Sequence, residues 1–427
     1  MIDPELLRKD FNDVAKRIRT RNRPYQQLDD FAKVDQEWRT LVSQIQALNT
    51  KRNALSAQIT QLIKTNPKQA EQLKNDVVKI KHELEDLTKN ETVVHQRWYE
   101  TLCAIPNIPD PDVPIGADEN DNVELRKVNK PKQLTFKPLP HWELAEKLEI
   151  ADFVRGVKIG GSRHTVFVGD GARLMRALRD FTLDMHRKAG YLELLPPILI
   201  NADVLYGTGH LPKSREDMFE LTNGQFLSPT EEVPLVGAYA NEKLDEKTLP
   251  LKLTSSTVSF RSEAGTAGKD MRGVIRQHQF YNTEMVIYCL PKDSEKQLEL
   301  MTAECEAVLK ALKLPYRVIA LCTGDMGSAA VKTYDVEVWF PCNNKYREIS
   351  SCSNCREYQA RGSHIKYLNT KTKQADFVHT LNGTGTSLNR LWIAVVENYQ
   401  TKSGTINIPL ALQKYMDGQK VIRKPKH

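Results

Sequence analysis

Basic side chains cluster on a loop between two β-prone segments, where they could bind a multiply charged anion. Residues 258–260 and 285–288 are rich in Val, Ile, Tyr and Phe, which favour strands, and glycines between them supply turns. The loop carries four basic residues, Arg261, Lys269, Arg272 and Arg276. A guanidinium group binds two oxygens at once, so the loop predicts a polyphosphate site. The alternative is a solvated hairpin whose charges do no chemistry.

Acidic and hydroxyl side chains accompany these arginines along the chain. Glu263 and Glu284 fall in the same region, although an anion site alone would not require them. Residues 230–232 read Thr-Glu-Glu, a pattern that also occurs at an ordinary helix N-terminus. Residues 379–390, HTLNGTGTSLNR, place a glycine turn before a helical pattern, and such a turn suits an anion. Arg390 adds positive charge at that position.

The sequence gives little support for a metal site at the cysteines. Cys352 and Cys355 form a CxxC pair within KYREISSCSNCR, but a zinc site needs further ligands, and Cys342 is the only nearby candidate. We therefore do not expect these thiols to bind a metal. The chain has seven cysteines, an odd number scattered along its length, which favours a reducing, cytoplasmic compartment.

The order of these segments resembles the seryl-tRNA synthetases, a family of class II aminoacyl-tRNA synthetases. FRSEAG, then RG, then HQF, then a strand glutamate resembles motif 2, and residues 379–390 resemble motif 3. The segments SPTEEV and EISSCSN resemble the serine-recognition and magnesium segments of the family. A helical pattern over 173–188, followed by GYLELLPPILI, resembles motif 1 and implies a homodimer. The resemblance extends over essentially the whole chain.

The resemblance implies a role for each matching residue. Arg261 would bridge the serine carboxylate and the α-phosphate of ATP, Arg390 would hold the γ-phosphate, and Glu348 with Ser351 would place Mg²⁺, so Arg261, Glu348 and Arg390 form the implied catalytic set. The implied L-serine set is Thr230, Glu231, Glu232, Arg261, Glu284 and Thr384, with Glu284 on the ammonium and Thr384 on the hydroxyl. The implied ATP set is Arg261, Ser262, Glu263, Phe280, Glu348, Ile349, Ser350, Ser351 and Arg390, with Glu263 on the adenine amino group and Phe280 beneath the ring.

Two positions depart from the pattern that the resemblance implies. Many relatives carry a small residue at the position of Glu231, so recognition of serine falls first to Thr230 and Glu232. The family often has Arg-Arg where this chain has Arg361-Gly362, which leaves phosphate or tRNA contacts there open.

Two heptad repeats of similar length predict a long helical hairpin over about 27–100. Apolar residues alternate steps of four and three, and only Arg52 and Glu91 interrupt them. The first arm carries Val34, Trp38, Leu41, Ile45, Leu48, Leu55, Ile59 and Leu62, and the second carries Leu73, Val77, Ile80, Leu84, Leu87, Val94 and Trp98. Thr65-Asn66-Pro67 would form the turn. Two such helices can bury one another's apolar seam as an antiparallel coiled coil.

The predicted tip of this hairpin is basic. Residues 51–81 carry Lys51, Arg52, Lys64, Lys68, Lys74, Lys79 and Lys81 against only Glu71 and Asp76. A basic tip on a long rod can contact phosphates. The alternatives are a solvated face or an oligomerisation arm. The resemblance implies that the arm binds the long variable arm of tRNA(Ser), and also tRNA(Sec) where that tRNA is present.

Length, composition and net charge indicate the broad class of the protein. The chain has 427 residues, 40% of them hydrophobic and 27% charged, and a net charge of +7, which fits a globular protein of two domains. No apolar run is long enough for a membrane span. We expect an N-terminal domain over 1–105, a proline-rich linker over 106–120 and an α+β catalytic domain over 121–427. The resemblance implies that this last domain is a class II antiparallel β-sheet flanked by helices.

Two other functions remain open from the sequence. A synthetase-like paralogue that loads a carrier protein would be expected to lack or alter the helical arm. A coiled-coil or tRNA-binding protein with an inactive site would not need the arginine and glutamate set of the cleft. The full-length arm and the presence of Arg261, Glu263, Glu348 and Arg390 argue against both.

Overall fold

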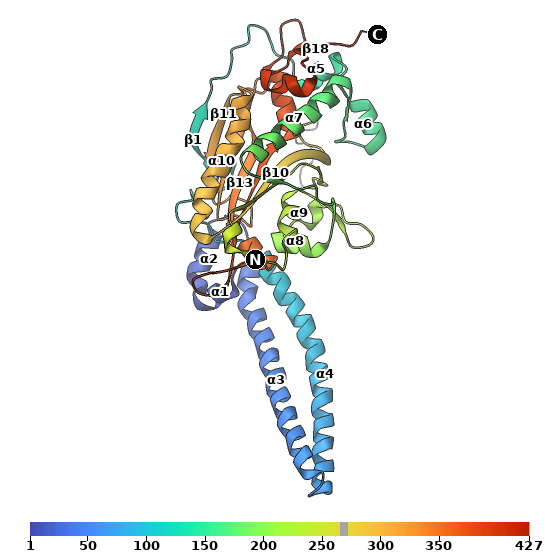
Figure 1. Cartoon of the computed structure of the whole chain (residues 1–427), viewed down its shortest axis with the longest axis vertical. Coiled ribbons are helices and arrows are strands. Elements are labelled where there is room, and N and C mark those ends of the chain that lie inside the picture. The colour runs from blue at the N-terminus through green and yellow to red at the C-terminus, as the bar shows by residue number, and fades with distance from the viewer. Residues whose placement is uncertain (265–271, 427) are drawn as a thin grey trace. The chain divides into compact units, whose positions relative to one another are not determined.

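The computed structural model describes residues 1–264 and 272–426, so the predicted basic residue Lys269 lies outside the described part. The chain forms two compact units (Figure 1). One contains residues 2–15 and 24–105 and is helical. The other contains Met1, residues 16–23 and residues from Pro106 onward, and is built on a large sheet.

The helical unit is dominated by two long helices. Helices α3 (Gln26–Leu62) and α4 (Pro67–Ala104) run side by side (Figure 1). The turn between them ends at Asn66, whose side chain caps α4 by accepting a hydrogen bond from the Gln69 main-chain nitrogen, and Pro67 occupies the first turn. Two short helices precede the pair, α1 (Pro4–Lys9) and α2 (Phe11–Arg19). The predicted hairpin is confirmed.

The predicted heptad seam is the buried face of this hairpin. Every apolar residue of the two repeats is buried or half-buried, whereas most neighbouring positions are exposed. The interrupting Glu91 accepts a hydrogen bond of 2.8 Å from the Trp38 indole nitrogen. Trp38 in turn stacks on Trp98, with ring centroids 4.4 Å apart. A polar residue is therefore accommodated in the seam because an aromatic N–H partners it.

The second unit contains a nine-stranded sheet. Its order is β1-β11-β12-β13-β16-β10-β8-β4, with β9 paired to β10, and every pair is antiparallel except β4 with β8. The strands are β1 (Val123–Val128), β4 (Leu192–Glu193), β8 (Leu251–Ser255), β9 (Val258–Phe260), β10 (Gln279–Cys289), β11 (Tyr316–Ala320), β12 (Lys332–Phe340), β13 (Lys345–Arg356) and β16 (His379–Ser387). The predicted α+β class and its largely antiparallel sheet are confirmed.

Three helices cover one face of this sheet. They are α7 (Gly169–Lys188), α10 (Ser294–Ala311) and α12 (Leu388–Asn398). Alternate strand residues point toward them, and these form the main core, including Met285, Ile287, Val336, Val338, Cys352 and Leu381. At Gly383 the helix α10 approaches closely, because a Cβ atom there would lie 2.7 Å from the Met301 sulfur. The residues between these core positions point to the opposite face.

Smaller elements surround the sheet. The remaining helices are α5 (His141–Lys147), α6 (Phe153–Gly160), α8 (Ala202–Thr208), α9 (Glu232–Gly237), α11 (Tyr358–Gly362) and α13 (Leu410–Gln413). Short strand pairs are β2 (Ala151–Asp152) with β3 (Val166–Phe167), β5 (Leu199–Ile200) with β6 (Phe226–Leu227), and β17 (Ile406–Asn407) with β18 (Val421–Ile422). A three-stranded sheet contains β7 (Lys243–Asp245), β14 (Lys366–Leu368) and β15 (Ala375–Phe377). In the described ranges, no helix is both long and apolar enough to cross a membrane.

Residues 16–23 belong to the sheet unit although the sequence grouped them with the arm. Arg21 is 1% exposed, and its guanidinium donates to the main-chain oxygens of Asn107 (3.0 Å) and Gly327 (3.1 Å). Asn107 lies in the predicted linker, and its side chain donates to the main-chain oxygen of Cys355 at 2.9 Å. The start of the proline-rich segment is therefore bound to the sheet unit by specific hydrogen bonds.

We expect the α3–α4 seam to hold the arm together, which a matched pair of substitutions tests. Leu84 is 7% exposed and Val93, on the same helix, is 68% exposed. Leu84→Ala should destabilise the arm by about 2–5 kcal/mol, and Val93→Ala by less than about 0.5 kcal/mol. Amide hydrogen exchange of α3 and α4 in the full chain measures this difference. Equal exchange rates in the two variants would contradict the assignment of the seam.

Candidate functional site

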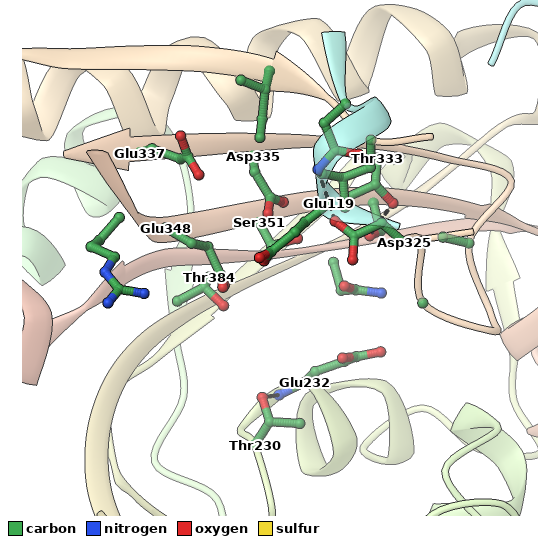
Figure 2. Close-up of a pocket in the computed structure, with 18 of the residues that line it drawn as sticks. Glu119, Thr230, Glu232, Asp325, Thr333, Asp335, Glu337, Glu348, Ser351 and Thr384 are labelled. Atoms are coloured by element: carbon green, nitrogen blue, oxygen red, sulfur yellow. Dashed lines mark hydrogen bonds between the residues drawn. The ribbon is translucent and has the colours of Figure 1, made fainter. Parts of the chain in front are cut away.

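The face of the sheet opposite the helices forms one wall of a large polar cavity of about 980 Å³. Thr333, Asp335 and Glu337 of β12 line it, as do Ser351, Ser353 and Cys355 of β13, and Asn382 and Thr384 of β16. Thr230 and Glu232 face these residues from the far side (Figure 2). Alternation along each strand thus sends apolar residues to the helices and polar residues to the cavity.

Glu348 and Ser351 share this face because β13 contains a bulge. They are three positions apart, so a regular strand would point them to opposite sides. The pairing with β12 skips Ile349: Val336 lies opposite Ser350, and the next residue, Glu337, lies opposite Glu348. The extra residue shifts the alternation by one, which turns both Glu348 and Ser351 into the cavity.

The arginines that line the cavity include Arg261 and Arg276, from the connection between β9 and β10, and Arg390. Arg261 follows β9, donates from Nε to the Pro229 oxygen at 3.1 Å, and lies over the Phe280 ring at 5.1 Å. Arg276 also lines the cavity and forms an ion pair with Glu263. Arg390, in the first turn of α12, lies 3.0 Å from the Glu348 carboxylate.

Of the basic loop residues that predict a polyphosphate site, Arg261 and Arg276 thus line the cavity. Arg272 is exposed and is absent from the described lining of the cavity. Arg261 is exposed and the Arg390 side chain is 24% exposed, so both guanidinium groups can meet a ligand.

Carboxylates near Arg390 could help to hold a hard cation. The positive charge of Arg390 lowers the pKa of Glu348, so this carboxylate is ionised at neutral pH. Asp335 lies opposite Ser351, is 8% exposed, and its Oδ1 atom has no hydrogen-bond partner among the described residues. Burial raises the pKa of Asp335 well above its usual value. A buried oxygen without a partner, next to Glu348 and Ser351, fits the oxygen ligands that Mg²⁺ prefers.

In the described chain, no three His, Cys, Asp or Glu side chains form a complete metal site by themselves. The CxxC cysteines do not share a site: Cys352 lies in the core 3.5 Å from Cys305, while Cys355 faces the cavity and accepts a hydrogen bond from Asn382. All seven cysteines fall within the described ranges and are free thiols.

Two glutamates, Glu284 buried and Glu232 half-buried, form the opposite end of the cavity. Glu284 of β10 is 3% exposed and accepts a hydrogen bond of 2.9 Å from the Thr384 hydroxyl. Glu232, at the start of α9, accepts one of 2.6 Å from the Gln359 amide. Burial raises the pKa of Glu232 to about 7, and burial together with the charge of Glu231 raises the pKa of Glu284 well above its usual value. Both groups border Arg261, which favours their ionised forms.

Comparison with known proteins assigns the chain to a family. Residues 1–109 match the model of the seryl-tRNA synthetase N-terminal domain, and residues 219–399 match that of the tRNA synthetase class II core domain (G, H, P, S and T). A serine–tRNA ligase of Ureaplasma parvum is 48% identical over 417 residues, which cover 97% of this chain and 100% of that protein. The chain belongs to the seryl-tRNA synthetase family. A serine–tRNA ligase of Malacoplasma penetrans is 46% identical over the full length of both chains.

A solved structure supports the same family over the entire chain. The seryl-tRNA synthetase from Pyrococcus horikoshii, determined in complex with ATP, has a TM-score of 0.89 and 33% identity to this chain, with full coverage of both. The predicted family and class II fold are therefore confirmed.

The cavity brings together most of the residues that the sequence selected. Eight of them line it: Thr230, Glu232, Arg261, Glu284, Glu348, Ser351, Thr384 and Arg390. Their individual roles stay predictions. The remaining residues of the predicted sets are placed differently, and their side chains are absent from the described lining.

Glu231 is turned away from the cavity. It is 1% exposed, and its carboxylate accepts hydrogen bonds from the Thr257 nitrogen (3.1 Å), the Thr257 hydroxyl (3.0 Å) and the Ser259 hydroxyl (3.1 Å). Burial raises the pKa of Glu231 to about 7. Its side chain therefore supports β9 from behind, and direct contact with a ligand is not available to it in this arrangement.

Ile349 and Ser350 also face the helices. Ile349 belongs to the main core, and the Ser350 hydroxyl donates to the Gly385 oxygen at 3.3 Å. Only their main-chain atoms could contact a nucleotide.

The other three residues of the predicted ATP set that are absent from the lining contact protein groups. The Ser262 hydroxyl donates to the Glu216 oxygen at 2.6 Å, Glu263 pairs with Arg276, and Phe280 lies beneath the Arg261 guanidinium.

Sequence reasoning missed several lining residues. Thr333, Asp335 and Glu337 alternate with apolar residues in KTYDVEVWF, a period-two pattern beside the EISS segment that could have revealed them. His210 also lines the cavity, and burial followed by the charges of Arg261 and Lys213 lowers its pKa to about 4. A lone histidine in a loop carries no comparable signal in the sequence.

Proposed function

We propose that this cavity activates L-serine with ATP to form seryl-adenylate and pyrophosphate, and that the chain then transfers serine to tRNA(Ser). Membership of the family, whose curated relatives are serine–tRNA ligases, makes the chain an aminoacyl-tRNA ligase. The observation that carries the assignment of this site is that Arg261 and Arg390 line the same cavity as Glu232, Glu284 and Thr384.

The reaction brings two anions together. A carboxylate oxygen of serine attacks the α-phosphorus of ATP, a new C–O–P linkage forms, and pyrophosphate leaves with the electron pair of the broken P–O bond. The nucleophile is already ionised, so no protein base is needed. Alignment and charge neutralisation lower the barrier. Arg261 would contact both the serine carboxylate and the α-phosphate, and Arg390 would bind the γ-phosphate.

Mg²⁺ would bind beside Arg390. Glu348 and Ser351 would supply oxygen ligands on the floor of the cavity, and the buried Oδ1 atom of Asp335 adds an oxygen on the neighbouring strand. When bound, the ion would neutralise phosphate charge. The low pKa of Glu348 keeps this ligand ionised without the metal, because Arg390 compensates its charge.

The other end of the cavity suits serine. Glu232 and Glu284 would face the ammonium, and Thr384, whose hydroxyl donates to Glu284, would contact the serine hydroxyl. A site that hydrogen-bonds this hydroxyl discriminates against alanine, since buried polar groups would otherwise be left unpaired. For ATP, Glu263 and Phe280 lie next to Arg276 and Arg261. Adenine binding at this position would require Glu263 to share its carboxylate with Arg276.

The helical arm is proposed to bind the tRNA. Lys51, Lys64 and Lys68 are exposed near its tip, and phosphates are the expected partners of such a group. We propose that the same surface also accepts tRNA(Sec) where that tRNA is present. We also propose a cytoplasmic location, which this role and the seven free thiols support.

A homodimer is proposed through the segment that follows α7. Strand β4 is an edge of the large sheet; Leu192 in this strand is 54% exposed, and Leu195, two residues after it, is 85% exposed. Exposed apolar side chains on an edge strand are unfavourable unless a partner covers them. A second copy of the chain, docked along this edge, would remove both from water.

We expect Arg261→Ala to lose serine-dependent ATP–pyrophosphate exchange by roughly 100-fold or more, because a preorganised positive charge at the α-phosphate is removed. The control is Arg423→Ala, an exposed arginine near the C-terminus, which should exchange at the normal rate. Unfolding temperatures of both variants should match that of the unsubstituted protein. Normal exchange by Arg261→Ala would refute the assignment.

Removal of the arm separates activation from transfer. With residues 30–100 replaced by a short linker, we expect exchange to persist and charging of tRNA(Ser) to weaken. A milder variant, Lys64→Glu with Lys68→Glu, should raise KM for tRNA by roughly tenfold through lost phosphate contacts, and Lys89→Glu, nearer the base of the arm, should not. Unchanged charging after deletion would show that the arm has another role.

Charge placed on the β4 edge should dissociate the dimer. We expect Leu195→Arg to sediment as a monomer at concentrations where the unsubstituted protein sediments as a dimer. Leu410→Arg is the matched control, because Leu410 is 80% exposed on α13 and should leave the dimer intact. A dimer that persists in Leu195→Arg would place the interface elsewhere.

A further inference from the structure

Gln359 is a buried amide with three polar partners around the serine end of the cavity. It lies in α11, is fully buried, and does not itself line the cavity. Its Nε2 atom donates to Glu232 Oε1 at 2.6 Å and approaches the Thr208 main-chain oxygen at 3.4 Å. Its Oε1 atom accepts a hydrogen bond of 2.8 Å from the Thr380 hydroxyl. Each polar atom of the amide thus has a defined partner.

These partners fix which way the amide points. A threonine hydroxyl can donate to the amide oxygen, whereas a carboxylate and a main-chain carbonyl can only accept. The nitrogen must therefore face Glu232 and Thr208, and the oxygen must face Thr380. The reversed orientation would place the amide oxygen against the Glu232 carboxylate, with two acceptors in contact. In a fully buried position no water can relieve such a clash.

The same amide joins two walls of the cavity. Glu232 begins α9, and Thr208 ends α8, immediately before the loop with Gly209 and His210 that also lines the cavity. Thr380 lies on β16, four positions before Thr384 on the same strand. A single side chain therefore connects the Glu232 carboxylate to the central sheet and to the last residue of α8, which precedes the 209–210 loop.

We propose that Gln359 is a positioning residue of the serine subsite: its amide holds the Glu232 carboxylate in place to receive the ammonium of the amino acid. This inference rests on the proposed function, because it takes Glu232 as a contact of serine. Gln359 would act through Glu232 without touching the substrate.

Charges around Glu232 set the sign of the expected pH dependence. Burial raises the pKa of Glu232 to about 7, whereas the Gln359 hydrogen bond and the charge of Arg261 lower it. Glu284 from β10 and the Cys355 thiol from β13 also feel the Glu232 charge, and His210 lines the same cavity. Below its pKa Glu232 is protonated and cannot pair with an ammonium, so KM for serine should fall as pH rises through the pKa.

Loss of the Gln359 amide should move the fall in KM for serine to higher pH. The charged form of Glu232 loses a hydrogen bond, so the carboxyl holds its proton more strongly. The rise in KM for serine should be large in mildly acidic solution. It should shrink as the pH is raised, because Glu232 ionises at high pH even without Gln359. A variant with general structural damage would not recover in this way.

The test is the pH dependence of serine-dependent ATP–pyrophosphate exchange by the full chain. For Gln359→Met we expect KM for serine to rise roughly tenfold at neutral pH, with kcat and KM for ATP changed less than about threefold. The increase should largely vanish near about pH 9. Gln359→Glu should shift the profile further, because a second carboxyl faces Glu232. Gln374→Met, at an exposed glutamine, should match the unsubstituted protein.

Thr380→Val provides a second route if Gln359→Met does not fold. It removes only the hydroxyl that orients the amide, so it should shift the serine KM profile in the same direction by a smaller amount. An equal loss at every pH, or an equal rise of KM for ATP and serine, would overturn the inference. Absence of serine-dependent exchange in the unsubstituted protein would instead overturn the proposed function.

Discussion

Alternation of side chains along the central strands is the constraint on which the rest of this molecule depends. Strands β10, β12, β13 and β16 must bury one row of residues beneath α7, α10 and α12, and the intervening row is then committed to the opposite face. Apolar residues fill the first row. The second row therefore became available for polar and charged groups along β12, β13 and β16 and at Glu284 of β10, whereas Val286 and Tyr288 of β10 pack in a second apolar cluster. The cavity is the exposed side of the same strands that hold the unit together.

Local departures from this alternation are as important as the rule. The bulge at Ile349 brings Glu348 and Ser351 to one face, and a similar irregularity in the pairing of β10 with β16 leaves Glu284 opposite Thr384. Arg261 and Arg390 come from the ends of elements that border the sheet. Positive groups thus lie among carboxylates whose pKa values are shifted, downward at Glu348 by the charge of Arg390 and upward at Glu232 by burial.

The sequence predicted the features that depend on residues close together in the chain. The heptads of α3 and α4 form a one-dimensional pattern, so the seam and the turn at Asn66 could be read directly. The cluster of Arg261, Glu284, Glu348 and Arg390 came from matching motifs. The burial of Glu231 could not be foreseen, because it depends on Thr257 and Ser259, which reach it only after β9 has formed. The partnership of Gln359 with Glu232 spans 127 residues and has no local signal. Ile349 and Ser350 point toward the helices because of the bulge in β13, and no pattern in the sequence predicted that bulge.

A crystal structure with a non-hydrolysable analogue of seryl-adenylate would test the central claim most directly. The account predicts that the Arg261 guanidinium contacts the group that replaces the α-phosphate, that the serine ammonium lies between Glu232 and Glu284, and that Thr384 meets the serine hydroxyl. An analogue bound outside this cavity, or bound within it with Arg261 and both glutamates out of contact, would contradict the account.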